Sequence, residues 1–335
     1  LEAEVLRADD RLKEARRALE LLVTSLGLAE RRHQLQEGEP CPLLTTGNPD
    51  EPLKNCQQGE QRLQEWLSHP AFQSGLAPFV VALVAAELLL RLRLSGLAVI
   101  AGFCATVYLV ADFTFFPLTA VRKIILTGLA AGGIGLLLDL LFSGRSFVRY
   151  LVAIAGGAVA IWVFWTALGQ RSMQEALLYG AGAAVYVMWI AAAMDGLGNR
   201  PVQAGAAGWA LGLATGGAAL LGASALLGQL GLALGAACGA YLLIQMVSGQ
   251  KLPCGRTYTL ALSLLSGLIA AAALLLAKLP WYCLPVLAAI PLAAYIPVPE
   301  RPALWLQAII ASLFTGAVGA AALVLMWREA GGLPV

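Results

Sequence analysis

The sequence predicts an all-α polytopic membrane protein, in which a bundle of about ten transmembrane helices follows a soluble helical hairpin. Composition is the first observation, because 59% of the 335 residues are hydrophobic and only 13% are charged, against roughly 25% charged residues in soluble domains. The second is that charged residues are concentrated before residue 73. The third is a series of apolar segments, each close to the ~20 residues that cross a bilayer as a helix.

Residues 1–72 form the predicted soluble domain. Its first helix, 1–36, carries apolar residues at alternating spacings of three and four, the heptad pattern of a helix that packs in a coiled coil. This apolar seam consists of Val5, Ala8, Leu12, Ala15, Leu19, Leu22, Leu26 and Ala29. Gly38 and Pro40 end the helix, and a proline-rich loop leads to a second, shorter helix at 56–68.

Cys41 and Cys56 lie at the two ends of that loop. A disulfide between them would close the hairpin, and such a bond requires an oxidising compartment. The cysteine pair therefore favours an extracytoplasmic position for residues 1–72.

Residues 73–335 form the predicted transmembrane bundle. Its apolar segments are 76–92, 94–112, 123–142, 149–168, 175–194, 204–222, 228–247, 258–277, 281–297 and 303–327. Their apolar residues are continuous rather than alternating, and only a helix satisfies the backbone of such a segment within hydrocarbon. We therefore expect about ten crossings of a cell membrane, specifically a bacterial inner membrane.

Basic residues in the loops indicate the orientation, since cytoplasmic loops carry an excess of Lys and Arg. With the hairpin outside, the cytoplasmic loops hold Arg91, Arg93, Arg145, Arg149, Arg200, Lys251, Arg256 and Arg301. The opposite loops hold Arg122, Lys123, Arg171, Lys278 and Arg328. This mild bias agrees with the cysteine pair.

Ionisable residues inside a bilayer are the first candidates for a function. Glu87 is the clear acidic residue within an apolar segment, and it has two interpretations. It either pairs with Arg91 one turn later, which neutralises both charges, or forms a proton or cation site. Asp139 and Asp195 lie near segment ends, where we expect them to cap helices.

The ninth segment contains Pro285 and Pro291, which lack the amide donor and free carbonyl groups one turn back. A discontinuous helix at mid-membrane depth exposes backbone carbonyls to the substrate in some transporters, although simple kinks are more common. The candidate polar pathway combines these prolines with polar residues of other segments: Glu87, Thr215, Gln245 and Ser266.

Glycines recur at every fourth position in the sixth and seventh segments. They are Gly208, Gly212 and Gly216, and then Gly231, Gly235 and Gly239. This glycine-zipper spacing lets helix backbones approach closely in lipid, where packing drives association. We expect these residues to pack the two segments together, with a sliding or oligomerising interface as the alternative.

Several function classes are disfavoured. No phosphate-binding loop, serine-nucleophile motif or zinc-protease motif occurs, and the two histidines, His33 and His69, both lie in the soluble domain. A net charge of +2 gives no basic surface for nucleic acid. We expect no metal, cofactor or catalytic residue, and an enzyme is disfavoured.

Two functions remain. A transporter or channel-like permease is favoured by the helix count, the glycine-rich packing and the proline-broken segment. A non-catalytic accessory or scaffold subunit of a larger membrane complex is favoured by the scarcity of buried polar groups and by the heptad seam, which could dock a partner's helix. The expected partners are the lipid bilayer and either other membrane subunits or further copies of the chain.

Overall fold

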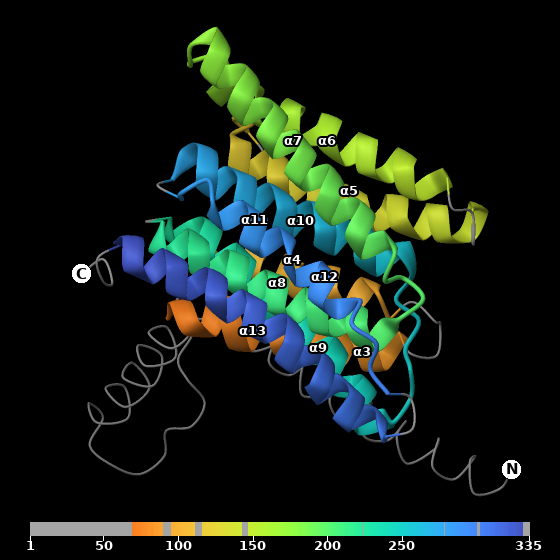
Figure 1. The fold of residues 1–335 in the computed structure, drawn as a ribbon. Helices are drawn as coiled ribbons and strands as arrows, with labels where there is room; N and C mark the ends of the chain where they lie inside the picture. Colours follow the sequence, from red (N-terminus) through yellow and green to blue (C-terminus); the bar gives the residue numbers. More distant parts are fainter. Residues whose placement is uncertain are drawn as a thin grey trace, which may run out of the picture. The chain divides into compact units, whose positions relative to one another are not determined.

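The fold is a bundle of helices (Figure 1), and the computed structural model describes residues 69–89, 95–110, 116–142, 147–222, 224–277, 279–299 and 302–330. The helices are α3 (Ala77–Leu89, preceded by the π-helical turn η1, Phe72–Leu76), α4 (Leu97–Val110), α5 (Ala120–Leu141), α6 (Phe147–Leu168), α7 (Met173–Asp195), α8 (Pro201–Leu221), α9 (Ala225–Ser248), α10 (Gly255–Leu276), α11 (Cys283–Ala288), α12 (Ile290–Ala294) and α13 (Leu304–Ala330). These ranges contain no strand, so the all-α class is confirmed for them. The heptad seam, Cys41 and Cys56 lie outside the described residues.

Eight helices in the described part are long and apolar enough to cross a membrane: Phe72–Leu89, Ala120–Leu141, Phe147–Leu168, Met173–Asp195, Pro201–Leu221, Ala225–Ser248, Gly255–Leu276 and Leu304–Glu329. Two of the ten predicted segments form shorter helices, Leu97–Val110 and Cys283–Ala294. Fourteen residues of α4 rise only ~21 Å, against the ~30 Å of hydrocarbon. Helix length therefore identifies eight candidate crossings among the described residues, and the predicted count of about ten stays a prediction.

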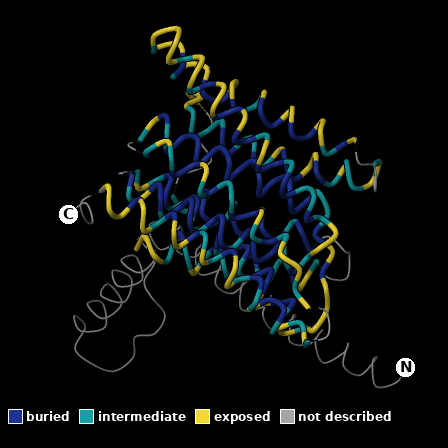
Figure 2. Tube along the Cα trace, in the orientation of Figure 1, coloured by how far each residue is buried: buried dark blue, intermediate teal, exposed yellow. Residues whose placement is uncertain are grey.

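Helix α10 forms the centre of the bundle. Of its membrane-crossing window, 89% is buried, against 33% for α5 and 28% for α13. Its second half carries the small residues 270–273, which let neighbouring helices approach closely. The buried residues gather around α10, while α6, α7 and α13 expose one side (Figure 2). Large apolar side chains on those sides, such as Trp165 and Leu313, are suited to contact lipid.

Hydrogen bonds at both ends of α10 fix the helix directions. Arg171, just before α7, donates to the carbonyl of Leu275 at 3.0 Å, whereas Asp195 at the end of α7 pairs with Arg256 in the first turn of α10. Helices α7 and α10 therefore run antiparallel along their whole length. We call the two ends of the bundle the Arg171 end and the Asp195 end.

Helices α8 and α9 touch through their backbones at the glycines. A Cβ atom built on Gly212 would lie 2.5 Å from Cα of Gly235, and one built on Gly231 would lie 2.5 Å from Cα of Gly216. Both distances are shorter than any real Cβ contact, so no side chain fits at this crossing. The remaining glycine of each series faces a larger side chain: Gly208 faces Tyr258 of α10, and Gly239 faces Trp209 of α8.

Candidate functional site

An open groove lies between α7 and the ninth apolar segment. Its volume is about 680 Å³. Its lining is mostly apolar and aromatic and includes Tyr179, Gly182, Trp189, Trp281, Pro285 and Leu292. Leu274, in the last turn of α10, completes the wall at the Arg171 end. This is the α7–α12 groove.

The wall that α7 contributes follows from helical periodicity. The lining residues of this helix lie between Leu178 and Trp189 at spacings of three and four, so they share one face. At 1.5 Å per residue this stretch is ~16 Å long. Because α7 runs from Met173 to Asp195, the groove begins in the second turn of the helix and extends past its middle.

The opposite wall is the ninth apolar segment, whose helices α11 and α12 are separated at a single residue, Ala289. This break is slight, because Ala289 keeps α-helical angles (φ −80°, ψ −17°) and its nitrogen donates to the carbonyl of Pro285 at 3.1 Å. The indole nitrogen of Trp189 donates to the carbonyl of Ala288 at 3.0 Å. This bond gives a partner to a carbonyl at the break and ties the inner end of the groove across to α7.

A cation lies at the outer end of the groove. The guanidinium carbon of Arg171 is 4.5 Å from the centre of the Tyr179 ring. The bond from Arg171 to Leu275 holds the same guanidinium next to Leu274, which also lines the groove. Stacking and the hydrogen bond together fix a half-buried positive charge at the Arg171 end of the bundle.

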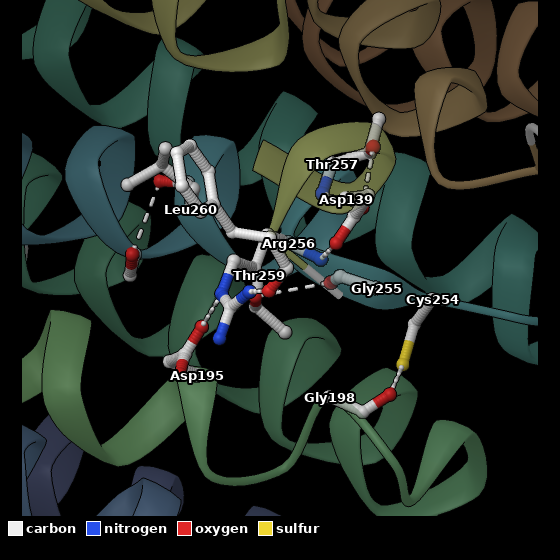
Figure 3. Close-up of polar contacts among 11 residues, drawn as sticks. Asp139, Asp195, Gly198, Cys254, Gly255, Arg256, Thr257, Thr259 and Leu260 are labelled. Atoms are coloured by element: carbon white, nitrogen blue, oxygen red, sulfur yellow. Dashed lines mark hydrogen bonds and ion pairs between the residues drawn. The ribbon is translucent and has the colours of Figure 1, made fainter. Parts of the chain in front are cut away.

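A second polar site, at the Asp195 end, caps the central helix (Figure 3). Asp139 of α5 accepts hydrogen bonds from the backbone nitrogens of Arg256 and Thr257, at 2.8 and 2.9 Å, and from the hydroxyl of Thr257 at 2.8 Å. Gly255 has φ +56°, and a Cβ there would collide with the Asp139 carboxylate. Only glycine therefore allows the carboxylate to approach the start of α10 this closely.

Arg256 joins three helices at this end. Its Nε donates to Oδ1 of Asp195 at 2.9 Å, and its terminal nitrogen donates to the carbonyl of Phe142 at 3.0 Å. The side chains of the Arg256–Asp195 pair are only 12% and 10% exposed. We call Asp139, Asp195, Arg256 and Thr257 the polar clamp, because it ties α5 and α7 to α10.

Cys254, the residue before the Gly255 turn, borders the polar clamp (Figure 3). Its thiol donates to the carbonyl of Gly198 at 2.8 Å. Burial raises the pKa of this thiol from its ordinary value of 9.0 to about 12. A thiol in this environment keeps its proton and acts as a structural donor rather than a nucleophile.

Two residues of the predicted polar pathway belong to the ninth segment. Pro285 lines the groove, and Pro291 is buried in α12. Thr215 is buried in the second half of α8, and its hydroxyl has no hydrogen-bond partner. None of these three residues adds a charge to the groove. The groove is therefore mostly apolar, unlike the predicted polar pathway.

The other three pathway residues lie away from the groove. Glu87 is exposed in the last turn of α3. Gln245 is buried near the Asp195 end, where its amide nitrogen donates to the carbonyl of Pro201 at 3.4 Å and its amide oxygen has no partner. Ser266 donates to the carbonyl of Leu262, 2.7 Å away in its own helix. The structure therefore does not gather the six residues around one cavity.

The sequence signal for the polar clamp was partly available. Asp139 and Asp195 were expected to cap helices, and Asp139 does cap a helix, although it is α10 rather than its own α5. Arg171 gave no signal beyond its loop position, because its partner Leu275 is 104 residues away. Within the described residues, no group of three or more His, Cys, Asp or Glu side chains could hold a metal ion.

The fold and the groove define a class: a polytopic α-helical membrane protein with a groove open on its side. No known protein-family model matches the chain, and no curated protein matches its sequence.

Proposed function

We propose that the chain is a membrane permease whose substrate enters the α7–α12 groove sideways from the bilayer. The observation that carries this proposal is the open groove between α7 and the ninth segment, whose second wall is interrupted at Ala289. Broken helices near the membrane midplane form substrate sites in many transporters. Irregular backbone at that depth is tolerated where protein buries it or where it lines a cavity.

The lining of the groove restricts the substrate. Tyr179, Trp189, Trp281 and Leu292 offer apolar and aromatic surface, so a small hydrated ion would lose its water without gaining ligands. A substrate with a large apolar part would keep apolar surroundings when it moved from the lipid into the groove. This proposal replaces a polar route through Glu87 with an apolar route along α7.

We further propose that the two shorter apolar helices, α4 and Cys283–Ala294, also pass through the membrane, which gives ten passes. Trp281, before α11, lines the groove near the Arg171 end, whereas Tyr295, after α12, donates to the carbonyl of Ala193 in the last turn of α7 at 2.9 Å. The ninth segment thus follows α7 from one end towards the other. Local thinning of the bilayer accommodates short helices of this kind.

The polar clamp supports a conformational role for α7. This helix lines the groove with residues 178–189 and joins the clamp through Asp195. A rearrangement of the Arg256–Asp195 pair would release one end of a groove wall. The proposed cycle therefore opens and closes the groove by movement of α7 against α10.

A translocation assay tests the permease directly. Purified protein in liposomes is given a fluorescent NBD-labelled phospholipid, and dithionite reports how fast the label reaches the outer leaflet. We expect Gly182→Trp, which fills the groove, to abolish the protein-dependent rate. Gly133→Trp is the matched control, because both glycines are exposed on helices with nothing within 4 Å of a Cβ. Equal rates for the two variants would refute the proposed route.

The accessory-subunit function is supported by one observation, the backbone contact between α8 and α9. Gly212 and Gly235 leave no room for these helices to slide past a side chain, which suits a rigid scaffold. Purification in mild detergent followed by mass spectrometry tests this alternative. A partner present in fixed proportion would favour the scaffold, whereas a chain isolated alone or as a homo-oligomer would favour the permease.

A further inference from the structure

We propose that the α7–α12 groove holds one acyl chain of an anionic membrane lipid, with Arg171 bound to the headgroup. This inference names the substrate class of the permease. As a statement about transport, it rests on the proposed function. Lipid binding itself can be measured without transport, so the two proposals can fail separately.

The dimensions of the groove suit a single chain. It extends ~16 Å along α7, from the second turn past the middle of the helix. This length is close to the reach of one acyl chain, which is about half of the ~30 Å hydrocarbon thickness. Its volume of about 680 Å³ lies within the range of small-molecule binding pockets. In a bilayer, the material that faces an apolar groove on the side of a bundle is lipid tail.

The aromatic residues are placed as a lipid requires. Trp281 is 68% exposed and lies before α11, at the outer end of the groove. Tyr179 lies in the second turn of α7 at the same end. Tryptophan and tyrosine favour the headgroup level of a membrane, where a ring meets both apolar and polar surroundings. Towards the inner end the lining is mostly apolar, with the Tyr186 hydroxyl and the Trp189 indole as its polar groups.

The charge at the outer end selects the headgroup. A guanidinium has five N–H donors, and the bond from Arg171 to Leu275 uses one of them. The stacking on Tyr179 holds the remaining donors at the membrane boundary, and an arginine fork fits a phosphate in two-point contact. Glu175, the nearest acidic residue along the chain, is exposed in the first turn of α7. Its charge weakens the attraction of Arg171 for a phosphate, but Glu175 does not form an ion pair with the guanidinium.

Photolabelling in nanodiscs tests the assignment. The probes are phosphatidylglycerol and phosphatidylcholine, each with a diazirine near the end of one acyl chain, and the labelled positions are mapped by peptide mass spectrometry. We expect labelling of α7 between Leu178 and Trp189 and of α11–α12. Phosphatidylglycerol should be favoured roughly fivefold, because that factor corresponds to the attraction of one arginine near an anionic membrane surface.

Two variants separate the headgroup from the chain. Arg171→Gln should remove the preference for phosphatidylglycerol and leave phosphatidylcholine labelling unchanged, whereas Gly182→Trp should remove groove labelling by both lipids. Lys123→Gln is the control for charge, because Lys123 lies at the same end but bonds to the carbonyl of Trp162 on α6. It should leave the preference intact.

Three outcomes decide the proposal. Equal labelling by both lipids, unaffected by Arg171→Gln, would mean annular lipid only and would overturn the inference. Labelling that avoids the groove, together with translocation, would overturn the inference but keep the permease. Selective groove labelling without translocation would support the lipid site and refute the permease.

Discussion

Removal of the Asp139 carboxylate should destabilise the bundle more than any other single carboxylate change among the described residues. In Asp139→Ala, two backbone N–H groups of α10 and the Thr257 hydroxyl lose their acceptor. Loss of a helix N-cap costs about 1 kcal/mol, and each buried donor left unpaired costs about 1–3 kcal/mol. Because water at the membrane boundary reaches part of this end, we expect a total of about 3 kcal/mol.

The expected change can be measured as a shift in melting temperature. For a unit of this size, 1 kcal/mol corresponds to roughly 2–4 °C, so Asp139→Ala should melt roughly 6–12 °C lower. Asp139→Asn keeps one acceptor oxygen and should lose about a third as much. Intrinsic tryptophan fluorescence during heating of the detergent-solubilised protein reports the transition, with Glu87→Ala as the control, because Glu87 is exposed in the last turn of α3.

The reasoning fails if Asp139→Ala and Glu87→Ala melt at the same temperature. That result would mean that water or another side chain satisfies the first turn of α10 as well as the carboxylate does. A salt titration gives a second check. The buried clamp should be insensitive to ionic strength, since salt screens exposed charges far more than buried ones.

Three further changes have definite expected outcomes. Gly212→Ala should destabilise the protein by about 1–3 kcal/mol through overpacking, whereas Gly133→Ala, which has open space at its Cβ, should be neutral or stabilising in the same melting assay. Trp189→Phe removes the bond to the carbonyl of Ala288 and should cost about 1 kcal/mol, a drop of a few degrees. Cys254, with its pKa raised to about 12, should resist N-ethylmaleimide at pH 8 until SDS is added. Because its thiol would ionise near 9.0 in the unfolded chain, its contribution to stability should be complete below pH 9 and decrease as the pH rises towards 12.

The transmembrane segments could be predicted because hydrocarbon imposes one local rule. A segment must be apolar over about 20 residues and must satisfy its own backbone, so the sequence alone contains the signal. The segment predicted at 258–277 corresponds to α10, Gly255–Leu276, within a few residues at each end. Hydropathy did not predict the lengths of the helices at 94–112 and 281–297, because it scores apolar residues whether or not they are helical.

The two sites could not be predicted because their members are distant in the sequence. Asp139 and Arg256 are 117 residues apart, and no spacing rule relates them. The groove has no motif of its own: Trp189 and Pro285 meet only because α7 and the ninth segment pack side by side. Polarity alone selects residues such as Gln245 and Ser266 for the pathway. In the structure these buried side chains donate to backbone carbonyls and do not line the groove.

The arrangement of tight and open contacts indicates which part of the bundle can move. Helices α8 and α9 are in contact through backbone atoms at Gly212 and Gly235, and such a contact has one geometry. Helix α7 meets the ninth segment across a groove, with side-chain hydrogen bonds from Trp189 to Ala288 and from Tyr295 to Ala193. Helix α7 also packs against α6 and α10, and its polar bonds to α10 lie at its two ends, at Arg171 and Asp195. A ligand that binds the remaining donors of Arg171 therefore lies beside one of these bonds, so occupation of the groove and the position of α7 should depend on each other.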